Sequence, residues 1–406
     1  MSKWSSRFGS ASTEQIDGFE VGELLVSLTD KSLVMFDDST GRYRLLETVR
    51  AYARIMLAAN GAAESMRTRH QAHYLALAEE AEPELTGADQ VAWLERLEVE
   101  HDNLRAALEW SAGQPEGTES GLRISGALWR FWFVRGHLSE GQMHLERALG
   151  REGAQDRTAE RAKTLNGAGN VLSRQGNYQE ARSLYEQSLA ICRELGDRPG
   201  VARALGNMGN LSQLEFDYAA SESLHQESLT IRRELGDRWG VGVLLGNLGK
   251  NAYCIGDYSA ATGFQEESLA IFKELGHQWG IANGVSNLGD LSLQQGDYAA
   301  ARALQQESLA IFRDLGDRWG IAEALQGLAA AAGGQGHGER AARFWGAAEA
   351  LREANGSPMD PEEREKHTLW MAAARESVGA EAFTAALAEG RAMTMNQAIE
   401  SALEDS

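Results

Sequence analysis

The chain has 406 residues and a formal net charge of −20, with 59 acidic and 39 basic side chains. Such an acidic balance disfavours non-specific binding to nucleic acid or to anionic membranes. Five prolines among 406 residues favour a mostly helical protein, and two cysteines cannot form a disulfide framework and suit a reducing cytoplasm. The longest apolar stretch, 127–134, is too short to cross a bilayer and contains Arg130.

The N-terminal segment 1–18 is rich in Ser and Gly and has no apolar signal region, so it is expected to be disordered. Residues 23–57 then indicate a helix, a hairpin and a second helix. Leu24, Leu25 and Leu28 form one apolar helical face, and two short strands flank the turn DDSTG. We expect this small unit to occupy 19–60 and a helical connector to occupy 61–116.

From about residue 117 onward, a 40-residue period dominates the sequence. Identical residues recur in four columns, namely Gly196, Gly236, Gly276 and Gly316; Tyr178, Tyr218, Tyr258 and Tyr298; Leu189, Leu229, Leu269 and Leu309; and Ile191, Ile231, Ile271 and Ile311. A weaker copy precedes them and a degenerate copy follows, which gives six helix pairs over 117–356. Self-similarity at a fixed period predicts a solenoid in which each repeat packs on its neighbours. Residues 357–406 are expected to form a C-terminal helical cap.

Each repeat contains residues that end one helix and begin the next. Gly236 follows an apolar helical face and suits a positive φ at the helix C-terminus, while Asp237 suits the N-cap of the next helix. Gly256 and Asp257 repeat the device within the unit. Three glycines lie in the middle of predicted helices, where glycine costs about 1 kcal/mol relative to alanine: Gly209, Gly249 and Gly289. A close approach by a neighbouring helix would explain them.

The spacing of these positions resembles the tetratricopeptide repeat. The residues that carry the resemblance are Leu205, Met208, Gly209, Asp217, Tyr218, Ser221, Leu224 and Ser228. About six extra residues lengthen the junction between repeats relative to the family's usual unit, as in the repeats of bacterial signalling regulators. The resemblance implies an all-α superhelical solenoid that binds a protein or peptide. Trp239, Trp279 and Trp319 are interpreted as core residues between repeats rather than ligand-stacking groups.

The unit at 19–60 resembles the end of the winged-helix domain in signal-transduction ATPases of the STAND class, especially regulators of the AfsR and LuxR-like type. Segments 93–110 and 391–403 share this resemblance. The phosphate-binding loop G-x-x-x-x-G-K-[ST] does not occur in the sequence. We therefore interpret the chain as the sensor part of a bacterial STAND-type regulator without its ATPase module, with a partial winged-helix remnant. The alternative is a free-standing tetratricopeptide adaptor scaffold unconnected to transcription.

The sequence contains no recognisable catalytic constellation. No order of Ser, His and Asp or of Cys and His indicates a nucleophile, so we predict a non-enzymatic protein without cofactors. His70 and His73 are three residues apart but have no third ligand nearby in sequence, which favours a surface pair over a metal site. The arginines around the hairpin are interpreted as solvated side chains, so direct nucleic-acid binding is not expected.

Asparagines recur within the first helix of successive repeats and define the candidate groove. One column contains Asn207, Asn247 and Asn287; a second contains Asn170, Asn210, Lys250 and Asp290; and Asn166 precedes the first column by one residue. In the tetratricopeptide family these columns line the concave surface and bind extended peptides. Lys163 and Arg203, together with Lys250, favour an acidic segment as ligand, and a separate ATPase module is a further candidate partner. Alternatively, recent duplication or a structural ladder of amides explains the recurrence.

Overall fold

The computed structural model describes residues 18–37, 41–359 and 361–404. Apart from Gly18, the segment 1–18 that was expected to be disordered lies outside this range. The chain divides into two units, Met1–His73 and Tyr74–Ser406. Within the described ranges, no helix combines the length and the apolar character that crossing a membrane requires.

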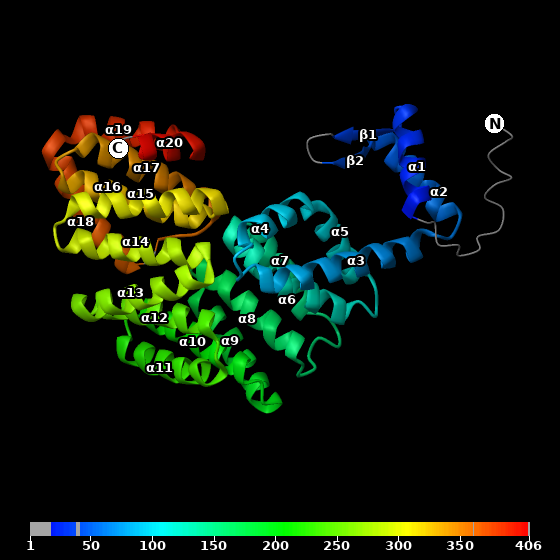
Figure 1. The fold of residues 1–406 in the computed structure, drawn as a ribbon, viewed down its shortest axis with the longest axis horizontal. Coiled ribbons are helices and arrows are strands. Elements are labelled where there is room, and N and C mark those ends of the chain that lie inside the picture. Colours follow the sequence, from blue (N-terminus) through cyan, green and yellow to red (C-terminus); the bar gives the residue numbers. More distant parts are fainter. Residues whose placement is uncertain (1–17, 38–40, 360, 405–406) are drawn as a thin grey trace. The chain divides into compact units, whose positions relative to one another are not determined.

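The first unit contains a helix, a hairpin and a second helix, in the order predicted for 23–57 (Figure 1). Its elements are α1 (Gly18–Asp30), β1 (Val34–Asp37), β2 (Arg42–Leu45) and α2 (Glu47–Ala59). The two strands are antiparallel, with Val34 opposite Leu45. Val34 is buried, whereas α2 contains no buried residue. The next helix, α3 (Ala63–Glu84), spans the boundary between the two units.

The second unit is an array of helices. Two short helices, α4 (Gln90–Val99) and α5 (His101–Gly113), come first. Six pairs follow: α6 (Thr118–Arg135) and α7 (Leu138–Leu149), α8 (Ala159–Arg174) and α9 (Tyr178–Leu195), α10 (Arg198–Leu214) and α11 (Tyr218–Leu235), α12 (Arg238–Cys254) and α13 (Tyr258–Leu275), α14 (Gln278–Gln294) and α15 (Tyr298–Leu315), and α16 (Arg318–Gly334) and α17 (Gly338–Asn355). The chain ends with α18 (Pro361–Val378), α19 (Ala380–Ala392) and α20 (Met395–Glu404). The six predicted helix pairs are confirmed.

The predicted helix-ending glycines and helix-capping aspartates of the repeats are also confirmed. Gly236 ends α11 with φ 69°, in the left-handed region that glycine adopts without strain. The Asp237 carboxylate accepts a hydrogen bond of 2.8 Å from the backbone N–H of Gly240 and so caps α12. Asp257 caps α13 in the same way through the N–H of Ala260, at 3.0 Å. Each repeat therefore ends one helix and begins the next with local chemistry.

The glycines in the middle of the first helices lie under side chains from the second helices. A Cβ atom added at Gly209 would lie 2.5 Å from the ring of His225, and one added at Gly249 would lie 2.6 Å from Gln265. The preceding repeat has the tightest of these approaches, because a Cβ at Gly169 would lie 2.4 Å from the Tyr185 ring. The expected close approach is therefore present, and it lies within each helix pair.

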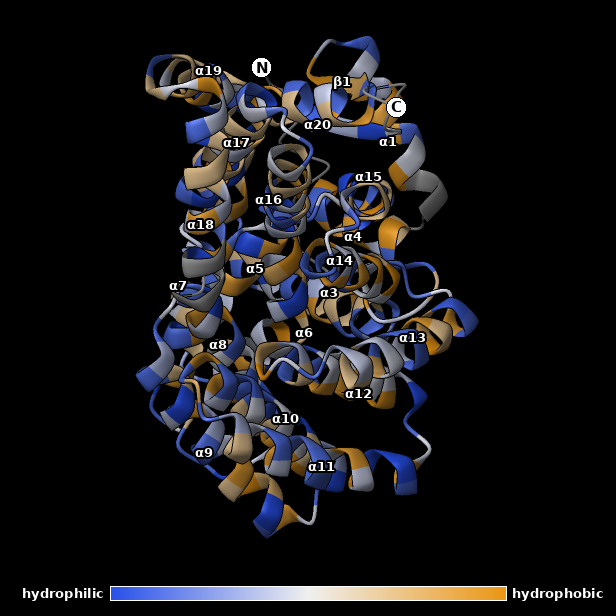
Figure 2. Ribbon diagram, turned by 90° about the vertical axis from the view of Figure 1, so that its left-hand side faces the viewer, coloured by the Kyte–Doolittle hydropathy of each residue, from blue (hydrophilic) through white to orange (hydrophobic). Residues whose placement is uncertain are grey.

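The superhelix of the second unit closes on itself. Arg174 of α8 stacks on Phe133 of α6 and on Trp319 of α16, with its Cζ atom 4.0 Å and 3.8 Å from the two ring centroids. The backbone N–H of Trp279 in α14 donates to Oε1 of Gln90, the first residue of α4, at 3.2 Å. One hydrophobic core cluster joins the helices of both ends. Hydrophobic and hydrophilic residues alternate along individual helices, as amphipathic packing requires (Figure 2).

Candidate peptide-binding channel

The closed superhelix surrounds a channel of about 280 Å³. Its walls come mainly from the first helices of successive repeats, α8, α10, α12, α14 and α16. Five of the ten candidate residues line it: Asn170, Asn210, Asn247, Lys250 and Asn287. A smaller cavity of about 60 Å³ shares Lys250 and Asn287 with the channel and adds Asp290. Four candidates line neither cavity: Lys163, Asn166, Arg203 and Asn207.

Two of the four residues outside the channel form a structural rung. Asn207 of α10 donates from Nδ2 to Oδ1 of Asn166 in α8, at 3.0 Å. Asn166 is buried, with 2 % of its surface exposed. A buried amide needs such a partner, since an unsatisfied polar group costs about 1–3 kcal/mol. At this step of the array, the amides connect adjacent repeats.

The second column bonds to the outer helix of its own repeat. Oδ1 of Asn170 accepts a hydrogen bond of 2.8 Å from the Tyr185 hydroxyl. Fifteen residues again separate the two partners in the following pairs: Asn210 with His225 at 3.0 Å, and Asp290 with Gln305 at 2.9 Å. These side chains line the cavities with part of their hydrogen-bonding capacity already used. They fix the outer helix against the channel wall.

Asn247 and Asn287 remain as the channel-facing members of the first column. Asn287 donates from Nδ2 to Gln265 Oε1 at 3.2 Å, which leaves its own Oδ1 available to accept. Asn247 is half-buried on the wall of α12 and makes no side-chain hydrogen bond within the described part of the chain. An amide in this position offers a donor and an acceptor to a ligand backbone.

The charge of the channel differs from that of the whole chain. Arg174, Lys250 and Glu323 are its charged lining residues, which gives a net charge of +1 in a chain of −20. Lys163 does not contribute, because its Nζ lies 2.6 Å from Glu82 Oε2. Arg203 lies outside the lining, near the guanidinium groups of Arg130 and Arg232. The lining is therefore locally positive through residues that only partly coincide with those expected from the sequence.

The junction tryptophans combine packing with channel lining. Trp279 and Trp319 are half-buried and line the channel. Nε1 of Trp279 donates to Oδ2 of Asp317 at 2.8 Å, so its polar edge is fixed by the N-cap of the next repeat. Burial raises the pKa of the Asp317 carboxyl, while the charge of Arg174 and hydrogen bonds from Gly320, Trp279 and Trp319 oppose that rise. The rings thus seal adjacent repeats and present an apolar surface to the channel.

Sequence reasoning missed the lining residues that come from outside the first-helix columns. Gln265 of the second helix α13 reaches the channel, and Arg174 and Glu323 lie at other positions of the first helices. The recurrence of Gln at 265 and 305 is a signal that could have identified the first of these. Arg174 reaches Trp319 only because the superhelix closes, which a repeat pattern does not reveal.

Comparison with known families identifies the repeats. Residues 160–274 match the tetratricopeptide repeat family in two overlapping segments, and residues 285–315 match a second tetratricopeptide repeat model. With the six helix pairs, these matches define an all-α tetratricopeptide-repeat superhelical solenoid. Repeats of this class are protein-binding scaffolds.

Curated relatives connect part of the chain to transcriptional regulators. Proteins of Mycobacterium tuberculosis (Rv0890c) and Mycobacterium bovis (Mb0914c), provisionally named HTH-type transcriptional regulators, are 43 % identical to this chain over 133 residues. The match covers 32 % of this chain and 15 % of the relatives' own length. This chain is therefore similar to a small part of each regulator.

Solved structures support the fold. A Rap protein in complex with Competence and Sporulation Factor is similar to 84 % of this chain and 99 % of its own, with 15 % identity and a TM-score of 0.52. The STAND protein with a tetratricopeptide repeat sensor from Pyrococcus horikoshii covers 94 % of this chain at 15 % identity, with a TM-score of 0.46. The first likeness supports the helical solenoid, and the second is too distant to support more.

Proposed function

We propose that this chain is the cytoplasmic, non-enzymatic sensor part of a STAND-type regulator, and that its channel binds an extended segment of a protein partner. The tetratricopeptide repeats support a protein-binding role. The 43 % identity to parts of HTH-type regulators supports a place in transcriptional control. The ATPase module of such a regulator is one candidate partner.

The observation that carries the proposal is the amide of Asn247 on the channel wall, which bonds to no other side chain in the described part of the chain. Its neighbours in the same column are bonded to other side chains, Asn207 to Asn166 and Asn287 to Gln265. An extended peptide exposes an N–H and a C=O at every residue, and a side-chain amide pairs with both irrespective of sequence. Each such bond contributes about 1 kcal/mol.

An acidic ligand suits the channel. Lys250 and Arg174 outnumber Glu323 among its charged residues. Complementary charge adds specificity and speeds association, most strongly at low salt. Trp279 and Trp319 provide apolar surface for side chains that alternate along the segment.

The test uses an array of synthetic peptides of equal length that differ in net charge. Binding to the full chain is measured by fluorescence polarisation, and we expect acidic peptides to bind best. Asn247→Ala should weaken binding by about thirtyfold, as the loss of two hydrogen bonds of about 1 kcal/mol each predicts. The matched control is Asn207→Ala, because Asn207 belongs to the same column but lies outside the channel.

Asn207→Ala should lower the melting temperature, because it leaves buried Asn166 without its donor, while peptide affinity stays near that of the wild type. An equal loss of peptide affinity in both variants would mean that the amides affect binding only by stabilising the fold. It would refute the proposal that the peptide binds in the channel. Preference for basic peptides would refute the acidic ligand.

A further inference from the structure

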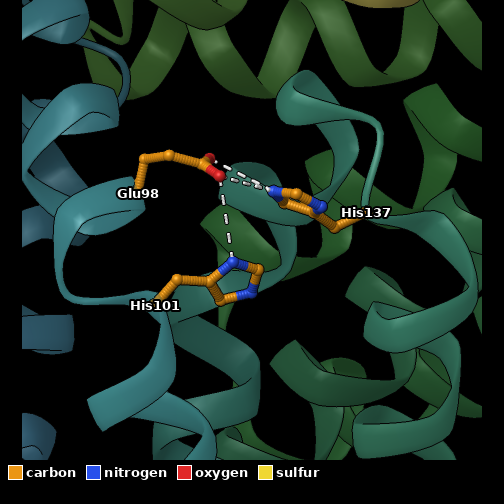
Figure 3. A group of neighbouring side chains, drawn as sticks. All are labelled: Glu98, His101 and His137. Carbon is orange, nitrogen blue, oxygen red and sulfur yellow. Dashed lines mark hydrogen bonds and ion pairs between the residues drawn. The ribbon is translucent and has the colours of Figure 1, made fainter.

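Three potential metal ligands meet where the helical connector joins the first repeat. Glu98 lies in the last turn of α4, His101 begins α5 and His137 directly precedes α7. One ligand atom from each lies within 4.8 Å of the other two (Figure 3). His137 Nε2 is 3.1 Å from Glu98 Oε2, and His101 Nδ1 is 3.9 Å from Glu98 Oε1.

A carboxylate on α7 orients the His101 ring. Nε2 of His101 lies 2.7 Å from Oε1 of Glu140, and Nε of Arg105 donates to the same oxygen at 2.9 Å. Because a carboxylate accepts, the ring donates through Nε2, and the neutral imidazole then has its lone pair on Nδ1. A carboxylate behind the far nitrogen is how metal-binding histidines are oriented in proteins.

The facing atoms of His101 and Glu98 suit a cation between them. In the neutral ring, the lone pair of His101 Nδ1 faces an oxygen of Glu98, and no hydrogen lies between them. A metal ion between the two atoms converts this repulsion into two bonds, and His137 Nε2 is close enough to supply a third.

We propose that Glu98, His101 and His137 bind one Zn²⁺ ion. Two imidazoles and one carboxylate are a typical zinc donor set, whereas Ca²⁺ and Mg²⁺ take oxygen ligands. Tetrahedral zinc with bonds of about 2.0–2.2 Å places neighbouring ligand atoms about 3.4 Å apart. From one oxygen of Glu98, Oε1, the separations are 3.2 Å to His137 Nε2 and 3.9 Å to His101 Nδ1, on either side of that value.

The packing around the site supports a structural ion. Phe131 of α6 contacts both imidazoles, with ring centroids 5.1 Å from His101 and 5.6 Å from His137, and so limits their rotation. Glu98 is 40 % exposed, so water occupies the fourth position of the ion. The three ligands do not line the channel or the smaller cavity beside it. The ion therefore ties α4 and α5 to the first repeat.

The test is a Zn²⁺ titration of the tag-free full chain after removal of metals with a chelator. Calorimetry should show one ion bound per chain, and bound zinc should raise the melting temperature. Co²⁺ should give the strong visible absorption of a four-coordinate site. His137→Asn should weaken zinc binding by more than tenfold and abolish the thermal shift. The fold accepts this change, since Asn177 occupies the same position of the next repeat and likewise precedes a helix.

The matched control is His337→Asn, because exposed His337 has the same position in the last repeat and belongs to no group of three potential ligands among the described residues. This variant should bind zinc like the wild type. Glu140→Gln keeps all three ligands and should weaken binding by about 10–100-fold, the usual effect of losing an orienting carboxylate. The proposed zinc site would be overturned if the wild type bound no zinc saturably. It would also be overturned if a folded His137→Asn chain bound zinc with the affinity of the wild type. Circular dichroism verifies folding.

Discussion

The two units of the chain differ in how they bury apolar side chains. Among the described residues, fourteen exposed large hydrophobic side chains lie before residue 74 and eight lie after it, although the second unit is several times longer. Among the described residues of the first unit, Val34 is the one buried hydrophobic side chain, whereas clusters of buried residues run through the second unit. In the array, each repeat covers the apolar face of the last. The first unit, the hairpin unit, contains no repeated element among its described residues that could cover its apolar side chains in this way.

The largest expected effect of this difference is in local stability. Hydrogen exchange under native conditions should show amides of α1 and α2 exchanging at least about a thousandfold faster than those of α12, because few buried contacts resist their opening. Comparable protection in α2 and α12 would show that the hairpin unit is stabilised by something other than its own core.

A second test concerns the close packing of second-helix side chains on the mid-helix glycines, which distinguishes the array from the first unit. Gly169→Ala should destabilise the chain by about 2 kcal/mol, because overpacking against the buried Tyr185 ring outweighs the helix-propensity gain. Chemical denaturation measures the change. The exchange rates of α1 and α2 should not alter.

The control for this test is Gly263→Ala, at an exposed position in α13 where nothing lies within 4 Å of the added methyl. It should stabilise the chain by about 0.5–1 kcal/mol, since alanine favours helix over glycine. If both substitutions stabilise, the outer side chains do not constrain the glycines, and the helix pairs are looser than their contacts indicate.

The array was predictable because its information is local and repeated. Gly236 and Asp237 specify a helix end and a helix start by their own backbone and side-chain chemistry, so the pattern alone located six pairs. The side chains that pack on the mid-helix glycines were harder to predict from the sequence. Tyr185, His225 and Gln265 share one position of the repeat but are chemically different.

The sites were harder to predict because they depend on distant pairs. The Asn207–Asn166 rung joins residues 41 apart, one more than the period, so an alignment by column separates them. Closure of the superhelix decides which amides face the channel. The candidate zinc ligands come from the ends of three helices, and His137 lies 36 residues beyond His101, without a local motif. His70 and His73, which do have helical spacing, belong to no group of three such ligands among the described residues.

The smallest expected effect is a difference between the two units in how their stability changes as the pH falls. Burial lowers the pKa of His225 to about 4, although its contact with the Gly206 backbone opposes the shift. In the unfolded chain, histidine titrates near about 6.5. The folded array therefore stays neutral at His225 while the unfolded chain takes up a proton, and stability present above pH 6.5 is lost as pH falls toward 4.

Between pH 8 and pH 5.5, His225 should account for a loss of roughly 1 kcal/mol of unfolding free energy, since each unit of pKa difference is worth about 1.4 kcal/mol once fully expressed. His225→Gln provides the comparison, because Gln265 and Gln305 fill the same position in the next two repeats. Urea denaturation of both chains at the two pH values isolates this contribution from that of other histidines. The wild type should lose more stability than the variant, whereas exchange in α1 and α2 should respond equally in both. Identical acid responses would show that His225 is protonated within the fold, so that the interior of this repeat admits water.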